Sequence, residues 1–202
     1  MQSKKLLIGI TGGIGSGKSI ACKYFEKLGY KVIYADTVAK ELYRTNRKLR
    51  DLVVKKFGKG ILDSSGRISR FNARKIIFSK KSNVKRVNSI VHPFVIDEID
   101  RIIKGIKNMI VLVETAIMFE SGYADRMDYV ILIYTNKKTR IARVRKRDNS
   151  KISDIEKLMR LQMDEREKIW HADFIIKNNS TTAELNRNIR SFSKILKCFI
   201  NN

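Results

Sequence analysis

The sequence predicts an α/β fold in which helices flank a parallel, five-stranded sheet. Short apolar runs alternate with longer helical patterns, and most of these runs are apolar on consecutive residues, as in strands buried on both faces. A glycine-rich turn between the first strand and the first helix marks a candidate site. The expected strands are Leu6–Ile10, Val32–Tyr34, Met109–Val113, Tyr129–Tyr134 and Asp173–Lys177.

Helices are expected between these strands. The first runs from about Lys18 to Leu28, with Gly29 as its C-terminal stop. Two others begin with capping boxes, Ser153-x-x-Glu156 and Thr181-x-x-Glu184. The last helix carries an apolar stripe that predicts a core-facing surface: Leu185, Ile189, Phe192, Leu196 and Phe199.

One interval, from about residue 48 to 107, breaks the alternation. It holds no convincing strand, only helical pattern and the chain's single proline, Pro93. Because it is too long for a simple crossover, we interpret it as a mostly helical insertion that forms a substrate lobe.

The composition is that of an ordinary folded protein, with 43% hydrophobic residues among 202. The only cysteines, Cys22 and Cys198, lie at opposite ends of the chain, which favours a reducing, cytoplasmic setting. The N-terminal apolar run stops at the glycines and lacks a cleavage pattern, and no stretch is long enough to span a bilayer. We therefore expect neither a signal peptide nor a membrane partner.

The net charge of +23, from 43 basic and 20 acidic residues, has two interpretations. One is nucleic-acid binding through a basic face. The other is a lysine-biased surface with a cleft for small polyanions. The basic residues are spread along the chain, without zinc-finger spacing or RRM-type aromatics, so we favour the second and expect no nucleic-acid partner.

Gly12-x-x-x-x-Gly17-Lys18-Ser19 is a complete Walker A pattern, with a strand before it and a helix after it. Glycines allow successive N–H groups to curl around phosphate oxygens, and the helix dipole points into the same space. Lys18 adds a full charge, and the Ser19 hydroxyl can ligate Mg²⁺. The pattern predicts nucleoside triphosphate binding.

Two carboxylates follow strands at the edge where parallel sheets bind ligands. Asp36 could accept the proton of an attacking hydroxyl, or it could simply cap the helix that follows. Glu114 ends an apolar run like the acid of a Walker B strand, which would assist Mg²⁺, or it could be an ordinary turn residue. Position alone leaves both alternatives open.

The segment "TRIARVRKRD" places Arg140, Arg143 and Arg147 on one helical face, where their guanidinium groups can converge. Converging arginines would neutralise charge on a transferring phosphoryl group. The alternative is a solvated basic helix.

Together these stretches resemble the dephospho-CoA kinase family from about residue 6 to 179. The resemblance rests on "ITGGIGSGKS" (10–19), "GYKVIYAD" (29–36), "NSIVHPFV" (88–95), "ETAIMFESG" (114–122), "RVRKRD" (143–148) and "LQMDEREKIWHADFIIKNN" (161–179). The order and spacing of the later segments make it more specific than a P-loop alone.

The resemblance implies a P-loop NTPase fold like that of nucleoside monophosphate kinases: one domain over 1–202, with a core (about 1–47, 108–136 and 172–202), a helical CoA-binding insertion (about 48–107) and a lid (about 137–171). It implies that Asp36, Lys18 and Arg143 are catalytic, and that Asp36, His92 and Glu120 bind the acceptor. The implied ATP-binding residues are Gly13, Gly15, Ser16, Gly17, Lys18, Ser19, Ile20, Arg143 and Arg147, and Ser19 is the implied Mg²⁺ ligand.

The chain departs from the family pattern at Tyr34, where the family usually has a first aspartate, so that only Asp36 remains. Ile20 replaces a threonine after the P-loop, and Ala116 replaces a proline. None of these changes removes a group that the reaction requires.

The expected reaction is transfer of the ATP γ-phosphate to the ribose 3′-hydroxyl of dephospho-CoA, giving CoA and ADP, the last step of coenzyme A biosynthesis. The expected partners are ATP and dephospho-CoA, for a monomer or small homo-oligomer. The alternatives are another nucleoside or nucleotide kinase of the same fold and a nucleic-acid-stimulated P-loop ATPase.

Overall fold

A computed structural model describes residues 5–77 and 79–199. The chain divides into two compact units. The first, here called the core unit, comprises the residues up to Tyr34 and those from Ile106 onward. The second, the helical unit, is Ala35–Gly105, so it begins before the insertion expected over about 48–107 and ends two residues before it does.

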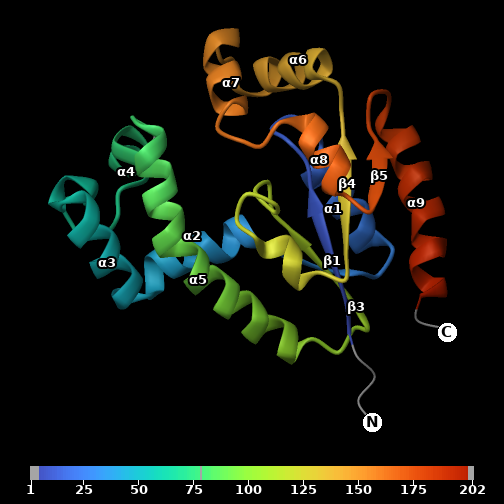
Figure 1. The fold of residues 1–202 in the computed structure, drawn as a ribbon, viewed down its shortest axis with the longest axis horizontal. Helices are drawn as coiled ribbons and strands as arrows, with labels where there is room; N and C mark the ends of the chain where they lie inside the picture. Colours follow the sequence, from blue (N-terminus) through green and yellow to red (C-terminus); the bar gives the residue numbers. More distant parts are fainter. Residues whose placement is uncertain (1–4, 78, 200–202) are drawn as a thin grey trace. The chain divides into compact units, whose positions relative to one another are not determined.

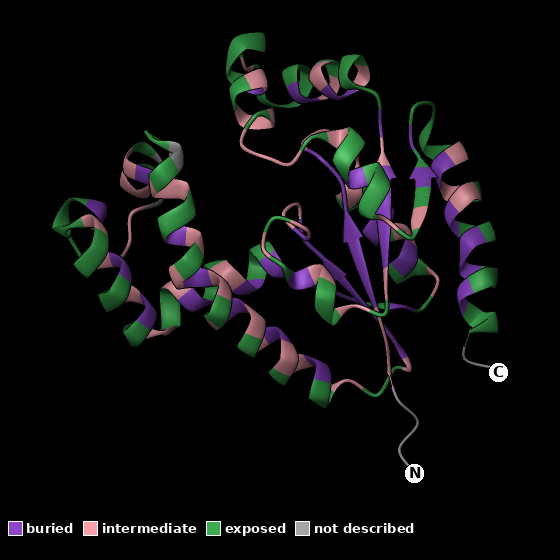
Figure 2. Cartoon of the chain, viewed as in Figure 1, coloured by how far each residue is buried: buried purple, intermediate pink, exposed green. Residues whose placement is uncertain are grey.

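The core unit holds the predicted five-stranded sheet, in the order β2-β3-β1-β4-β5 with every pair parallel. Its strands are β1 (Leu6–Thr11), β2 (Lys31–Tyr34), β3 (Ile110–Glu114), β4 (Tyr129–Tyr134) and β5 (Phe174–Lys177). Every predicted strand is present, with ends within one residue of those expected. The consecutive apolar residues are explained by burial, since all of β3 is buried (Figure 2).

One face of the sheet packs against α1 (Lys18–Lys27) and α9 (Thr182–Cys198). Their buried side chains join those of the strands in one apolar cluster: Ile8, Ile10, Ala21, Cys22, Phe25, Leu112, Ile131, Ile133, Leu185, Ile189, Phe192 and Leu196. The predicted stripe on the last helix is therefore confirmed except at its end. Phe199 lies one residue beyond α9 and is 41% exposed, with its ring stacked on Tyr129.

The predicted helix ends are confirmed in two of three cases. Gly29 follows α1 with a φ of 89°, a left-handed conformation that favours glycine. Thr181 caps α9 by accepting a hydrogen bond from the Glu184 N–H. The capping box at Ser153 is wrong: α7 (Ile152–Met159) begins one residue before it, and the Glu156 carboxylate pairs with Lys137, 2.8 Å away, rather than reaching back to a cap.

The cap on α9 gives a first testable prediction. Replacing Thr181 with Ala leaves a first-turn N–H without its acceptor and should lower the free energy of unfolding by about 1 kcal/mol. Thr182→Ala, one residue further on, is the matched control and should change it by less than about 0.5 kcal/mol. Urea denaturation of the two variants checks this, and equal stabilities would contradict the capping role.

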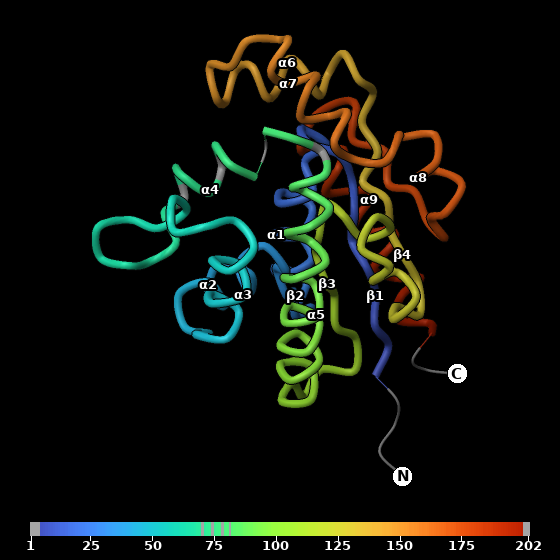
Figure 3. Tube along the Cα trace, turned by 60° about the vertical axis from the view of Figure 1, so that its left-hand side comes forward, coloured from blue at the N-terminus to red at the C-terminus, as the bar shows by residue number. Residues whose placement is uncertain are grey.

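Three further helices of the core unit follow β4: α6 (Lys137–Asp148), α7 and α8 (Glu165–His171). Asn136 caps α6 by accepting from the Thr139 N–H, and Asn149 ends it in the left-handed conformation. Figures 1 and 3 show α6 and α7 side by side beyond the carboxyl end of β4. A short 3-10 turn, η2 (Tyr123–Arg126), lies between β3 and β4.

The helical unit consists of α2 (Ala35–Thr45), α3 (Arg47–Phe57), η1 (Lys59–Ile61), α4 (Arg70–Ile77) and α5 (Lys81–Gly105). α5 packs against α2, α3 and α4 around buried side chains that include Leu49, Val53 and Ile99. The helical pattern that the sequence predicts for 48–107 is thus present. In the described part of the chain, every helix is too short or too polar to cross a bilayer.

Candidate active site

The candidate site is built on the loop between β1 and α1. β1 is the central strand, flanked by β3 on one side and β4 on the other. The chain leaves β1 toward one edge of the sheet and later returns to its opposite side, so the loop stands at a topological switch point, where parallel sheets bind ligands. Residues 12–17 curl between the strand and the helix, as the Walker A pattern predicts.

Two glycines of this loop are required by its geometry. Gly15 and Gly17 have φ angles of 80° and 89°, and Ser16 between them is not left-handed. Alternation of this kind shapes an anion-binding nest. The Ser16 N–H donates to the Gly13 carbonyl at 3.0 Å, so the N–H groups that the loop offers to an anion are those of Gly15 and Gly17. The N–H groups of Lys18 and Ser19, in the first turn of α1, have no acceptor within the helix and add to it.

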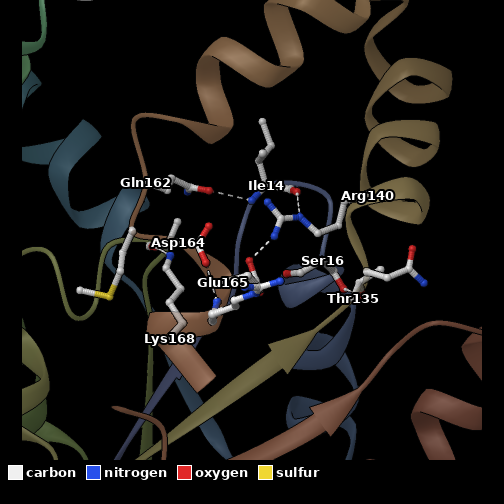
Figure 4. Close-up of polar contacts among 12 residues, drawn as sticks. Ile14, Ser16, Thr135, Arg140, Gln162, Asp164, Glu165 and Lys168 are labelled. Carbon is white, nitrogen blue, oxygen red and sulfur yellow. Dashed lines mark hydrogen bonds and ion pairs between the residues drawn. The ribbon is translucent and has the colours of Figure 1, made fainter. Parts of the chain in front are cut away.

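Side chains from the C-terminal part of the chain hold the peptide groups of Ile14 (Figure 4). The Ile14 N–H donates to Gln162 Oε1 at 3.0 Å, and the Ile14 carbonyl accepts from Arg140 Nε, also at 3.0 Å. The buried Arg140 guanidinium makes its second contact with Glu165, and desolvation raises the pKa of that carboxyl group. Both polar groups of one loop residue are therefore fixed.

The Ser16 carbonyl is held in the same way. Asn178 Nδ2 donates to it at 2.7 Å, and Thr135 Oγ1 lies 3.0 Å from it. Both side chains are buried. The Ser16 hydroxyl is buried too and has no hydrogen-bond partner among the described residues, an unsatisfied group of the kind that a bound ligand can satisfy.

Lys18 and Glu114 form an ion pair, with 2.7 Å between Nζ and Oε1, and both side chains are largely buried. The pair joins the start of α1 to the end of β3, so Glu114 belongs to the site. Ser19, one residue after Lys18, is exposed. A hydroxyl and a carboxylate beside a phosphate-binding loop are oxygen donors of the type that Mg²⁺ prefers.

Metal binding at this place would depend on phosphate oxygens as well. Among residues 5–77 and 79–199 no group of three or more His, Cys, Asp and Glu side chains could hold an ion. Mg²⁺ in nucleotide sites is typically held by one or two protein oxygens together with the phosphates, so the residues present fit this cation.

The three arginines of α6 do not share one set of partners. Arg140 binds the loop, as described above. Arg143 reaches Thr135 Oγ1 and the Ser180 carbonyl, each at 3.4 Å, and Arg147 pairs with the adjacent Asp148 at 2.7 Å on the surface. Arg140 and Arg143 thus both lie against the phosphate loop, beside Gly13 and Gly17, whereas Arg147 is directed to Asp148 and does not join them.

Asp36 and His92 belong to the helical unit. Asp36 is exposed in the first turn of α2, two residues after Tyr34, whose Cα pairs with that of Glu114. It lies inside the helix rather than before it, so the capping alternative is wrong. The His92 side chain is partly buried in α5, its Nε2 has no partner among the described residues, and desolvation lowers its pKa.

Glu120 has two partners in the core unit. Its carboxylate accepts from the Met163 N–H at 2.7 Å and pairs with the fully buried Lys168, 3.1 Å from Oε1. Lys168 also donates to the Ala116 carbonyl at 3.1 Å. These contacts fasten the segment before β5 to the loop after β3.

Comparison with known proteins decides the family. The family model for dephospho-CoA kinase matches residues 6–184, which include the phosphate loop, the helical unit and the segment around Asn178. The chain belongs to the dephospho-CoA kinase family. A dephospho-CoA kinase from Geobacter sulfurreducens is 35% identical over 186 residues, which cover 91% of this chain and 94% of that protein.

Solved structures agree with this assignment. The structure of dephospho-CoA kinase from Campylobacter jejuni is similar with a TM-score of 0.67 at 29% identity, covering 94% of this chain and 96% of that one. A crystal structure of a protein from Thermus thermophilus gives a TM-score of 0.82 at 25% identity, covering 96% and 99%. The predicted family and its P-loop kinase fold are thus confirmed.

In this dephospho-CoA kinase family member, sequence reasoning missed the side chains that support the loop. Gln162 and Asn178 lie in a segment that carried the resemblance, but nothing in their spacing from the Walker A pattern indicates contact with it. Glu165 lies in the same segment and likewise gave no indication of this contact, and Thr135 gave no signal at all. Arg140 was noticed only as a charge on a helical face.

Proposed function

We propose that this chain transfers the γ-phosphate of ATP to the ribose 3′-hydroxyl of dephospho-CoA, giving CoA and ADP. The observation that carries the proposal is the family match through residues 6–184, which runs across both units rather than the phosphate loop alone. The loop supports it, since its left-handed glycines and braced peptide groups form a cage for phosphate oxygens.

The core unit would hold ATP. The N–H groups of Gly15, Gly17, Lys18 and Ser19 would donate to the phosphate oxygens, while that of Ser16 stays bonded to the Gly13 carbonyl. Lys18 would turn from Glu114 toward the β- and γ-phosphates. Gly13 and Ile20 flank these groups in the chain and complete the proposed ATP site. Arg143 would add positive charge near the phosphates. Arg147 is a further proposed ATP contact, which requires that its ion pair with Asp148 breaks when ATP binds.

Asp36 would act on the acceptor. A carboxylate that accepts a hydrogen bond from the 3′-hydroxyl orients its oxygen for in-line attack and takes its proton as the bond to phosphorus forms. The chain connection supports this role. Asp36 comes two residues after Tyr34, the last residue of β2, and Tyr34 is paired with Glu114 at the end of β3. His92 and Glu120 are the further proposed acceptor contacts, and the insertion of about 48–107 is the proposed CoA-binding lobe.

Mg²⁺ is part of the proposal. The Ser19 hydroxyl would bind it, and Glu114 would assist once Lys18 has moved to the phosphates. When bound, the ion screens charge on the phosphate oxygens during transfer.

An acceptor panel tests the function. Purified protein with ATP and Mg²⁺ is incubated separately with dephospho-CoA, AMP, adenosine or short RNA, and ADP release is measured. We expect rapid release only with dephospho-CoA. Preference for AMP or adenosine would favour another kinase of the same fold. Stimulation by RNA that falls steeply with salt would favour the nucleic-acid-dependent ATPase.

A further inference from the structure

We propose that Arg140 and Asn178 are positioning residues: each fixes one peptide group of the phosphate loop and thereby aims one glycine N–H, that of Gly15 or Gly17, at the bound phosphates. The inference rests on the proposed use of ATP and adds a specific role for side chains outside the Walker A pattern.

The peptide group is planar, which links the direction of each carbonyl to that of the next N–H. In a trans peptide the C=O of one residue and the N–H of the next lie in one plane and point in opposite directions. A side chain that binds the carbonyl therefore also fixes the direction of the following N–H. Arg140 binds the Ile14 carbonyl, and the N–H of that peptide group belongs to Gly15. Asn178 binds the Ser16 carbonyl, and the N–H of that group belongs to Gly17.

Both glycines need such a constraint. Their left-handed conformations are accessible to glycine, but a glycine backbone is also the most free to rotate away from them. An N–H that is already aimed before phosphate arrives costs no reorganisation on binding. A side chain that binds the carbonyl does not block phosphate, because the carbonyl and the N–H point to opposite sides of the peptide group.

The positioning side chains fit against the loop only because the loop lacks Cβ atoms there. A Cβ on Gly13 would lie 2.6 Å from the Arg140 guanidinium, and one on Gly17 would overlap Asn178 Nδ2. The glycines of the Walker A pattern thus admit the supporting side chains on one side as well as phosphate on the other.

Each positioning residue is itself held. Arg140 is 6% exposed, and its charge is paired with Glu165. Asn178 is 4% exposed, and its main-chain carbonyl accepts from Thr135 Oγ1 at 2.8 Å, which holds the backbone from which the amide side chain projects. The single Thr135 proton can go to the Asn178 or the Ser16 carbonyl, while the hydroxyl oxygen accepts from Arg143 at 3.4 Å. Residues that are buried and paired in this way keep one orientation.

The test uses two altered proteins. Asn178→Ala removes the donor to Ser16. Arg140→Met combined with Glu165→Gln removes the donor to Ile14 without leaving a buried carboxylate unpaired. The matched controls are Asn188→Ala, which removes an amide donor to the Lys177 carbonyl, and Arg145→Met on the exposed side of α6. Circular dichroism and thermal unfolding establish that each protein folds.

Calorimetry then compares the binding of inorganic triphosphate, ATP and adenosine. We expect both altered proteins to lose at least about 10-fold in affinity for triphosphate and ATP, with adenosine affinity unchanged. The controls should bind all three like the parent. A loss shared equally by adenosine, or triphosphate affinity within twofold of the parent in folded protein, would overturn the proposal.

Amide NMR distinguishes positioning from general loosening. In the parent, triphosphate should move the Gly15 and Gly17 amide proton resonances downfield. Asn178→Ala should abolish the shift of Gly17 and keep that of Gly15, and the Arg140 double variant should do the reverse. If Asn178→Ala does not fold, Thr135→Val replaces it, because this change removes the hydroxyl contact to the Ser16 carbonyl. The triphosphate-induced shift of the Gly17 amide proton should then be smaller than in the parent. Parent-like shifts in the variants would contradict the inference, whereas a parent that binds no triphosphate would contradict the proposed function.

Discussion

Replacing Asp36 with Asn is expected to lower kcat by about 10²- to 10⁴-fold, the usual contribution of a positioned general base. The amide keeps the size of the side chain and can still hydrogen-bond, but it has no basic oxygen to take the proton of the 3′-hydroxyl. Since Asp36 belongs to the acceptor side of the proposed reaction, the dissociation constant for ATP should change by less than about twofold. Steady-state ADP release and calorimetry give the two values.

The matched control is Asp51→Asn, an exposed aspartate of α3 in the same unit that pairs with Arg50 at 3.0 Å. This change should leave kcat and ATP binding as they are. Unchanged turnover in Asp36→Asn would show that another group takes the proton.

Replacing Lys18 with Met is the second large effect, and should reduce kcat by about 10²- to 10³-fold, as expected for loss of one fixed charge beside the transferred group. The same change deprives Glu114, which is 5% exposed, of the cation with which it pairs. An unpaired buried carboxylate costs several kcal/mol of stability. The Lys18→Met, Glu114→Gln double variant removes this penalty.

If Lys18 acts on phosphate, the double variant regains thermal stability, and its kcat stays well below that of Glu114→Gln alone, which measures the proposed contribution of Glu114 to Mg²⁺ binding. Lys23→Met, an exposed lysine of α1, is the control and should behave like the parent. Recovery of activity in the double variant would mean that Lys18 serves mainly to neutralise Glu114.

Much of the fold was predictable because burial leaves a direct trace in the sequence. Strands covered on both faces need consecutive apolar residues, and the run ending at Glu114 is such a strand. α9 shows the helical counterpart, since its apolar stripe at Leu185, Ile189 and Phe192 is the buried face. Thr181 was recognisable because its cap is made with residues three positions away.

The predictions that were wrong concern groups with competing partners. Ser153 and Glu156 have the spacing of a capping box, but Lys137 of the neighbouring helix takes the Glu156 carboxylate. Arg147 has the spacing for convergence with Arg143, but Asp148 lies next to it in the chain. Spacing indicates what a side chain can reach but not which partner it takes, whether from another helix, as for Glu156, or from the next residue, as for Arg147.

The same reasoning explains which part of the site the sequence predicted. The Walker A residues lie within eight consecutive positions, so the phosphate loop was identifiable from residues 12–19 alone. Its supports, Gln162 and Asn178, are more than 140 positions away. Only the tertiary fold reveals them, because it brings two segments to the loop, one before β5 that carries Gln162 and one directly after β5 that carries Asn178.

The most direct test of the account is to identify where the phosphoryl group goes. ATP, Mg²⁺ and dephospho-CoA are incubated with the protein, and the products are followed by phosphorus NMR. We expect one ribose 3′-phosphomonoester, that of CoA, for each ADP formed, with little free inorganic phosphate. ADP accompanied by an equal amount of inorganic phosphate, with dephospho-CoA unchanged, would contradict it.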